Sequence, residues 1–351
     1  MLVLSQKFIL QLKHPPKFPQ QPMNIRLIFK LFLIQIFTTT VFNLSAQADG
    51  TATPKLAPQY MRINIQNDML IPRDKTDRYF SSGIKMEYLF MQNPNKNGII
   101  TKIFPKLPKS NNYSGLSAAS NMYTPANKSE NVIIGDRPYA GWAYLGLVGI
   151  SNDYINATRF TTEYSLGAIG PVTQQEYFQS KVHQLIGRPL PQGWKNQIAN
   201  DIAINLNFIG EKRLIKPINN IDMMGILETN IGTVNNYVGA GGMVRVGWFE
   251  DYFRNIAQVK GRNNWQLYAF ARPLVRLVAD NSLLQGGMFT YYKSPYVIPK
   301  DDLKRIYMNA ELGYGLTYRN FNVTYSQNIR TAEFKDAKTM FWGALTMACG
   351  F

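Results

Sequence analysis

The chain has 351 residues, 45% of them hydrophobic and only 17% charged, a composition that excludes an intrinsically disordered protein. The net charge of +16 favours anionic partners. However, the basic residues form no dense run and no recognition-helix motif, which argues against nucleic acid. The lone cysteine, Cys349, excludes an internal disulfide, so strand pairing and packing must provide the stability.

Residues 1–48 are predicted to be a leader. Residues 23–48 place Arg26 and Lys30 ahead of an apolar stretch and end in Ala46-Gln47-Ala48, which is typical of a signal-peptidase site. We interpret 23–48 as a signal peptide and the residues before it as a mis-assigned start. A membrane anchor is the alternative, but polar residues interrupt the apolar stretch well short of the ~20 residues that a spanning helix needs.

After residue 59, apolar and polar residues alternate with the period of β-strands. Many segments run ten residues or more, as a strand tilted across a bilayer requires, and the chain ends in an aromatic residue, Phe351, like bacterial outer-membrane barrels. The pattern predicts an all-β protein in which residues 49–351 form one 12-stranded antiparallel transmembrane β-barrel. The expected strands are 60–67, 79–91, 115–124, 139–151, 156–169, 200–213, 221–234, 237–250, 264–279, 305–319, 320–331 and 340–351.

Three segments break the strand pattern. Residues 283–294 are long enough for a further strand, but single-chain bacterial barrels have even strand numbers, so we expect an outer loop there. Residues 173–187 have helical spacing and stop at Gly187, which predicts a short helical insert in an outer loop. A second short helix is expected at 194–199.

Polar residues gather at one end of the predicted barrel. An exported barrel starts in the periplasm and its strands alternate in direction, so the odd-numbered connections lie outside. This places Asn67, Asp68, Ser81, Lys128 and the helical insert at the outer rim, where loops carry function more often than on the periplasmic side.

Each of these residues also has a structural interpretation. Asn67 and Asp68 form either an Asx turn that ends a strand or a functional pair, which would be an oxygen-rich calcium site or an oxyanion-stabilising pair. Ser81 is either a turn hydroxyl or a nucleophile, and Lys128 is either solvated or directed at a phosphate.

His183 is the only histidine left once the leader is removed. Histidine is the side-chain type that ordinarily changes its charge near neutral pH, so His183 is the candidate general base, although a surface histidine on a loop helix is the plainer interpretation. Gln179 lies four residues earlier, on the same helical face, where its amide could orient the imidazole.

These residues lie within motifs that resemble the outer-membrane lipid A 3′-O-deacylases of the LpxR type. The resemblance covers essentially the whole mature chain and is carried, in order, by QND (66–68), TDRYFSSG (76–83), MYTPANK (122–128), GDRPYAGWAYLG (135–146), LGAIGP (166–171), QQEYFQSKVHQLIG (174–187), GW..Q (193–197) and TAEF (331–334). It implies that Asn67, Asp68, Ser81, Lys128 and His183 are the functional set, with Gln179 supporting the histidine.

The resemblance implies a carboxylic ester hydrolase that removes the 3′-linked acyl chain of lipid A, or lipopolysaccharide, in the bacterial outer membrane. It implies a calcium ion at Asn67 and Asp68, with His183 activating water, Ser81 positioning the water or the ester, and Lys128 meeting phosphate or oxyanion charge. A serine acyl-enzyme stays open, as do a catalytically silent channel or binding barrel and an outer-membrane phospholipase. We expect a monomer.

Overall fold

The computed structural model describes residues 57–71, 78–93, 102–127, 129–218, 220–256 and 265–351, so the predicted leader lies outside the described residues. The chain divides into two compact units. The barrel unit spans Ala52–Tyr177 and Pro191–Phe351, and the described part of the other unit is Phe178–Leu190. None of the described helices is both long and apolar enough to cross a membrane.

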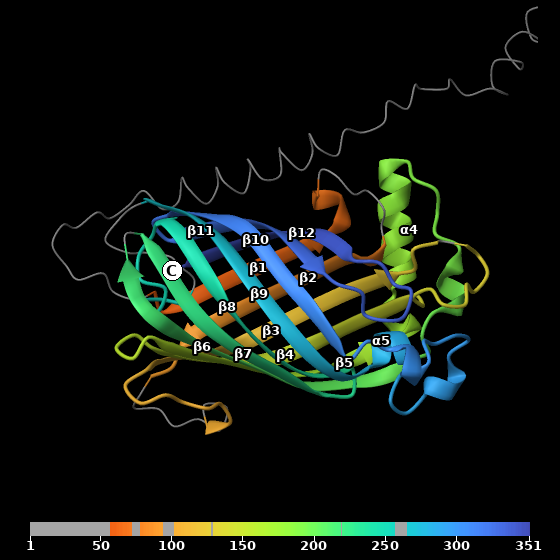
Figure 1. The fold of residues 1–351 in the computed structure, drawn as a ribbon, viewed down its shortest axis with the longest axis horizontal. Helices are drawn as coiled ribbons and strands as arrows, with labels where there is room; N and C mark the ends of the chain where they lie inside the picture. Colours follow the sequence, from red (N-terminus) through yellow and green to blue (C-terminus); the bar gives the residue numbers. More distant parts are fainter. Residues whose placement is uncertain (1–56, 72–77, 94–101, 128, 219, 257–264) are drawn as a thin grey trace, which may run out of the picture. The chain divides into compact units, whose positions relative to one another are not determined.

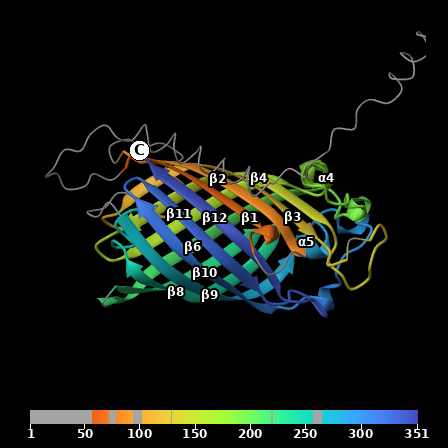
Figure 2. The same cartoon turned by 90° about the horizontal axis from the view of Figure 1, so that it is seen from above.

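Twelve antiparallel strands close into a barrel in which each strand pairs with its neighbours in sequence and β1 pairs with β12 (Figures 1 and 2). The predicted all-β fold and strand number are therefore confirmed. The strands are β1 (Gln59–Asn67), β2 (Tyr79–Met91), β3 (Asn111–Thr124), β4 (Ala140–Asp153), β5 (Thr158–Ile169), β6 (Asp201–Ile218), β7 (Ile221–Gly232), β8 (Asn235–Trp248), β9 (Trp265–Asn281), β10 (Ile306–Tyr318), β11 (Phe321–Arg330) and β12 (Met340–Gly350).

The segments between strands agree with the sequence analysis, with one correction. The predicted insert is helix α4 (Gln175–Ile186), and 283–294 is indeed a loop, with α5 (Ser282–Gln285) and the short 3-10 helix η4 (Tyr291–Lys293). The expected helix at 194–199 is instead a single 3-10 turn, η3 (Gly193–Asn196), because the chain extends again at Gln197. The remaining 3-10 turns are η1 (Asp68–Leu70), η2 (Pro171–Thr173) and η5 (Lys300–Asp302).

The two faces of the wall are chemically distinct, as strand alternation requires. On β2, Ile84, Met86 and Tyr88 are 43–45% exposed and face outward, whereas Lys85 and Glu87 face the lumen. The lumen is filled by charged pairs such as Lys85–Glu163 (2.8 Å) and Arg276–Glu228 (2.6 Å). Polar cavities of about 470 and 300 Å³ remain between the charged pairs.

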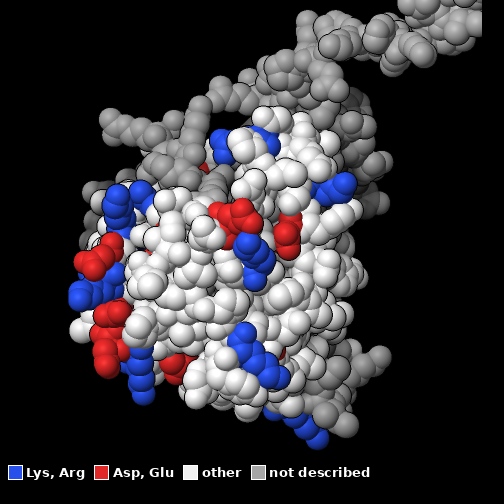
Figure 3. All heavy atoms as spheres, turned by 90° about the vertical axis from the view of Figure 1, so that its right-hand side faces the viewer, with Lys and Arg blue, Asp and Glu red and all other residues white. Residues whose placement is uncertain are grey.

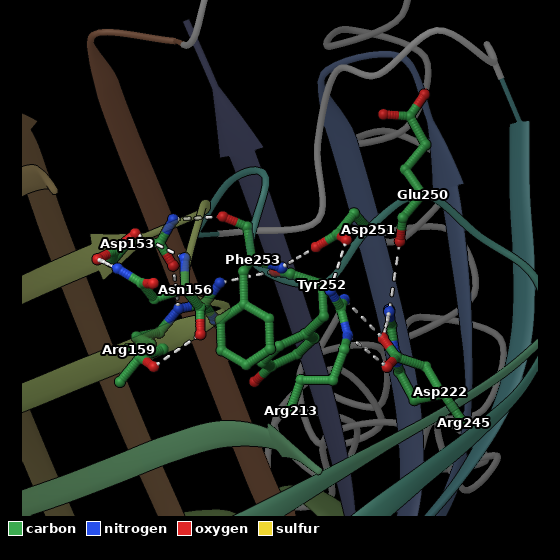
Figure 4. A network of polar contacts seen from close by, with 12 residues as sticks. Asp153, Asn156, Arg159, Arg213, Asp222, Arg245, Glu250, Asp251, Tyr252 and Phe253 are labelled. Atoms are coloured by element: carbon green, nitrogen blue, oxygen red, sulfur yellow. Dashed lines mark hydrogen bonds and ion pairs between the residues drawn. The ribbon is translucent and has the colours of Figure 1, made fainter. Parts of the chain in front are cut away.

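We call the end of the barrel that holds Gln59 and Phe351 the terminal end. There, the loop after β8 folds back into the lumen (Figure 4). Arg159 donates to the carbonyl oxygens of Tyr252 and Asn255 at 2.7 and 2.9 Å, and Asn152 donates to that of Phe253. Phe253 is fully buried, so this loop occupies the lumen with satisfied hydrogen bonds rather than leaving it open.

We call the opposite end, with the β1–β2 connection, the loop end. A hydrophobic cluster lies across it, built from strand ends and from the loops after β9 and β11. Phe80 and Trp342 come from the wall, whereas Leu284, Ile298 and Phe334 come from the loops, and all five are buried. Both ends of the lumen are therefore occupied by the protein's own side chains.

Candidate active site

Asn67 and Asp68 end the first strand at the loop end. The Asn67 side chain caps η1 by accepting a hydrogen bond from the Met69 amide at 2.8 Å, so the Asx-turn interpretation holds for this side chain. An amide oxygen has two lone pairs, and one remains for a further partner. Asp68 is 2% exposed, which places a buried carboxyl group directly after the strand.

Ser81 lies in a β-bulge between Phe80 and Ser82, where the β2–β3 register shifts. Just before the bulge, Tyr79 has a φ of 68°, and the Phe80 amide donates to the Arg78 carbonyl at 2.9 Å, which makes a γ-turn. Positive φ is costly for an aromatic residue, and bulges and strained residues are both concentrated at functional sites. This backbone distortion directs Ser81 toward Thr124, whose hydroxyl oxygen lies 2.6 Å away.

The Ser81–Thr124 pair lies on the outward face of the wall, not in the lumen. On β3 the odd-numbered Ser117 faces the lumen, because its hydroxyl donates to lumenal Glu163. The even-numbered Thr124 therefore belongs to the opposite face, together with Leu116, which is 61% exposed. Ser120 shares that outward face and accepts a hydrogen bond from Gln175 at 2.8 Å. A polar strip thus runs along a surface that barrels normally keep apolar.

Two contacts within the barrel unit hold the two ends of the β5–β6 connection against this outward face. The side chains of Thr173 and Gln175 pack directly over Gly141, where an added Cβ would lie 2.1 Å from the Thr173 hydroxyl oxygen. Trp194 is fully buried and packs against Tyr139 in a tilted arrangement, with the ring centroids 4.8 Å apart. These contacts give a structural reason for the glycine and tryptophan residues of two sequence motifs.

Helix α4 ends in a Schellman motif that orients His183. Gly187 has a φ of 68°, the Arg188 amide donates to the His183 carbonyl at 2.9 Å, and the Gly187 amide donates to the Gln184 carbonyl. The reversed chain brings the Pro189 carbonyl oxygen 2.6 Å from His183 Nδ1. Since a carbonyl only accepts, Nδ1 must carry the proton, and in the neutral ring Nε2 is then the nitrogen that carries the lone pair. Sequence reasoning missed this contact.

The burial pattern of α4 is the reverse of that of a soluble helix. Gln179 and His183 are 4% and 6% exposed, whereas Phe178, Val182 and Leu185 are 51–61% exposed. The polar side chains of this part of the helix are therefore buried and its apolar side chains are exposed, the opposite of an amphipathic helix at the surface of a soluble protein. Gln179 shares the buried face with His183, and its supporting role stays a prediction.

The motif residues Arg137 and Glu333 form a buried ion pair that sequence reasoning did not find. Their atoms Nη1 and Oε2 lie 2.6 Å apart, both side chains are at most 1% exposed, and Arg330 also pairs with Glu333 at 3.1 Å. Burial by itself would raise the pKa of Glu333, but the two guanidinium groups outweigh burial and lower it. The pair joins the loop after β3 to the loop after β11, 196 residues apart.

The neighbouring Asp136 holds the segment that follows β3. Its carboxylate accepts hydrogen bonds from the Ala126 and Asn127 amides at 3.1 and 2.9 Å. Lys128 itself lies outside the described residues, so its predicted role stays a prediction. Basic and acidic side chains are interspersed on the loop-end face (Figure 3), so recognition of phosphate there would depend on individual side chains rather than on a broad basic field.

An apolar hollow of about 500 Å³ lies on the outer wall, next to the polar strip. Its lining includes Ile84, Met86, Leu145 and Leu166, together with small residues of β3 and β4 and the strip residue Ser120. Lipid-facing strands, small side chains and an adjoining polar edge together suit an acyl chain that ends in a polar group.

Asn67 and Asp68 are of residue types that can bind a hard cation. Asn67 and Asp68 offer an amide and a carboxylate oxygen, which are the ligand types that calcium prefers. Within the described ranges, no group of three or more His, Cys, Asp or Glu side chains could hold a metal.

The barrel unit brings Asn67, Asp68 and Ser81 together at the loop end, since Asn67 pairs with Ser82 across β1 and β2. It adds Thr124, which sequence reasoning had not singled out although it lies within a motif. His183 and Gln179 belong to the other unit.

A family model described as outer membrane protein LpxR matches residues 31–351. The solved structure of LpxR from Salmonella typhimurium has a TM-score of 0.65 and 18% identity, and covers 83% of this chain and 100% of that chain. The beta domain of the Bordetella autotransporter BrkA covers 85% and 100% at a TM-score of 0.44 and 9% identity, too distant to support an argument. No curated protein matches.

Proposed function

The chain belongs to the LpxR family of outer membrane proteins, and we propose that it is a lipid A 3′-O-deacylase that hydrolyses the 3′-linked acyl ester in the outer leaflet. The deacylase activity comes from the family. The likeness to the Salmonella protein, at 18% identity, supports the fold.

The polar strip on the lipid-facing wall is the observation that carries the proposal. A channel would place its functional polar groups in the lumen, whereas Ser81, Thr124 and Ser120 face outward. They adjoin an apolar hollow on the same strands. A lipid ester has an apolar chain and a polar reacting group, so it matches both surfaces from within the membrane.

In the proposed mechanism, His183 acts as the general base. Its Nε2 removes a proton from water while Pro189 holds the proton on Nδ1, and the hydroxide adds to the ester carbonyl carbon. The imidazolium then returns the proton to the leaving 3′-alkoxide as the C–O bond breaks. The products are a free fatty acid and the 3′-hydroxyl of lipid A, so atoms and charge balance.

The other residues bind the substrate and orient the reacting groups. Ser81, fixed by Thr124, positions the water or the ester, and Lys128 meets phosphate or oxyanion charge. Asn67 and Asp68 would hold a calcium ion, which supplies positive charge for the carbonyl oxyanion when bound. A serine acyl-enzyme is the competing route, and trapping a covalent acyl–Ser81 species would favour it.

Mass spectrometry of lipid A from cells with and without the protein tests the proposal. We expect loss of one 3′-linked acyl chain only when the protein is present, and no loss with a folded His183→Ala variant. Unchanged lipid A in both strains would contradict a deacylase. Lysophospholipid release instead would favour the phospholipase alternative, and ion conduction would favour the channel.

A further inference from the structure

Residues 102–110, which precede β3, pack onto the outer wall near the terminal end; they are found in Figure 1 by the orange colour below the strands. Phe104 is 6% exposed and lies over Gly149 of β4, where an added Cβ would come within 2.2 Å of its ring. The Tyr164 hydroxyl donates to the Ile103 carbonyl at 2.9 Å, and the Leu107 amide donates to the Ser151 hydroxyl at 2.8 Å. The segment is thus fixed in place by packing and hydrogen bonds.

The wall beneath this segment is the lipid-facing one. Gly149 and Ser151 alternate with the inward-facing residues Val148 and Ile150, and share a face with Leu145, which is 70% exposed. Tyr164 likewise alternates with lumenal Glu163. The segment therefore lies where the lipid next to the barrel would otherwise touch the wall.

The exposed side of the segment is amphipathic. Ile103 is 41% exposed, and the nearby β4–β5 turn presents Ile155 at 72%. Lys102, Lys106 and Lys109 are exposed, and residues 102–112 contain no acidic residue. Of the three, Lys109 interacts electrostatically with the Asp153 carboxylate at the end of β4. Lysines beside apolar groups at a membrane boundary place their stems in the apolar layer and their ammonium groups at lipid phosphates.

We propose that residues 102–110, with the turn at 154–157, form a binding surface for anionic phospholipid headgroups in the membrane leaflet at the terminal end. The lysines supply the charge, and the Phe104–Gly149 contact fixes their depth on the wall. This surface is at the opposite end of the barrel from the polar strip and does not depend on the deacylase proposal.

Native mass spectrometry of the purified full chain in detergent, titrated with phosphatidylglycerol or with phosphatidylcholine of the same acyl chains, tests this. Wild type should prefer phosphatidylglycerol. The triple variant Lys102→Gln, Lys106→Gln, Lys109→Gln should lose that preference by about ten-fold or more, since each lysine near an anionic lipid is worth about a five-fold change. The matched control Lys304→Gln, Lys335→Gln, Lys338→Gln, in loop-end segments, should keep it.

A second variant separates placement from charge. Gly149→Ala keeps all three lysines but pushes Phe104 off the wall, so it should also lose the preference. Gly210→Ala is its control, because an added Cβ there meets its nearest atom at an ordinary 3.5 Å. Heat-modifiable gel mobility verifies folding. A preference retained by the triple variant or by Gly149→Ala, or absent from wild type, overturns the proposal.

Discussion

The hydroxyl oxygens of Ser81 and Thr124 lie 2.6 Å apart on the lipid-facing side of the barrel wall. Both side chains are at most 3% exposed, so each supplies the hydrogen bond that the other needs where water is scarce. We infer that this hydrogen bond fixes the position of the Ser81 oxygen.

Ser81→Ala should lower the deacylation rate about ten- to hundred-fold, the loss typical of misplaced reactants. Ser81→Thr keeps the hydroxyl and should stay within a few-fold of wild type. Thr124→Val removes only the partner and should fall between them. Fatty acid release from purified lipid A in detergent measures all three, and a fully active Ser81→Ala protein would remove Ser81 from the mechanism.

Calcium should be needed for activity and should bind at Asn67 and Asp68. Chelation should abolish deacylation reversibly, and added calcium should raise the unfolding midpoint of wild type, because a ligand that binds only the folded state stabilises it. Asp68→Ala should lose the calcium-dependent shift while keeping the barrel. The shift is measured without substrate, so it tests the site separately from catalysis. Full activity in excess chelator would exclude the metal.

Glu333 should make the free energy of unfolding decrease as the solution becomes acidic. Its pKa is lowered by Arg137 and Arg330, so the native state favours the charged form more than the unfolded state does. The contribution is therefore present above the unfolded pKa near 4.3 and is lost as pH falls through the depressed native value.

Glu333→Gln tests this pair, since breaking a buried ion pair costs about 3–5 kcal/mol. The variant should unfold earlier at neutral pH and lose the acid-dependent part of the curve. Glu130→Gln is the control, because the Glu130–Lys195 pair, 2.7 Å apart, is more than half exposed and should contribute little. Equal effects of the two substitutions would contradict the assignment.

Changes that open the lumen should not affect deacylation at the candidate active site. Because protein side chains occupy both ends of the lumen, wild type in planar bilayers should show no large steady conductance. Arg159→Ala removes the hydrogen bonds to the Tyr252 and Asn255 carbonyls and should increase leakage without changing deacylation. Large ohmic currents from wild type would instead support the channel alternative.

Strand alternation was sufficient to predict the barrel because each strand buries or exposes alternate residues over its whole length. β6 continues past its predicted end at residue 213, and the additional part of the strand includes exposed polar residues such as Lys216. The alternating direction of the strands predicted that Asn67 and Ser81 lie at the same end of the barrel. It did not predict on which face of the wall Ser81 lies, because the bulge at Ser81 breaks the alternation. The Pro189 contact of His183 and the Arg137–Glu333 pair arise from backbone reversal and long-range packing, which no local pattern encodes.

The last prediction concerns His183 as the general base. His183→Ala should leave the barrel folded, because the twelve strands close through their own pairing, yet lower the deacylation rate by about 10²–10⁴-fold, the range for lost acid–base catalysis. Gln179→Ala should do less damage, because it would loosen the ring without removing it. Gly187→Ala, which strains the reversal that brings the Pro189 carbonyl to Nδ1, should also lower the rate and leave the fold intact. Release of 3′-linked acyl chains, with heat-modifiable mobility as the folding control, compares all three variants, and a folded His183→Ala protein with near-normal turnover would require a different base.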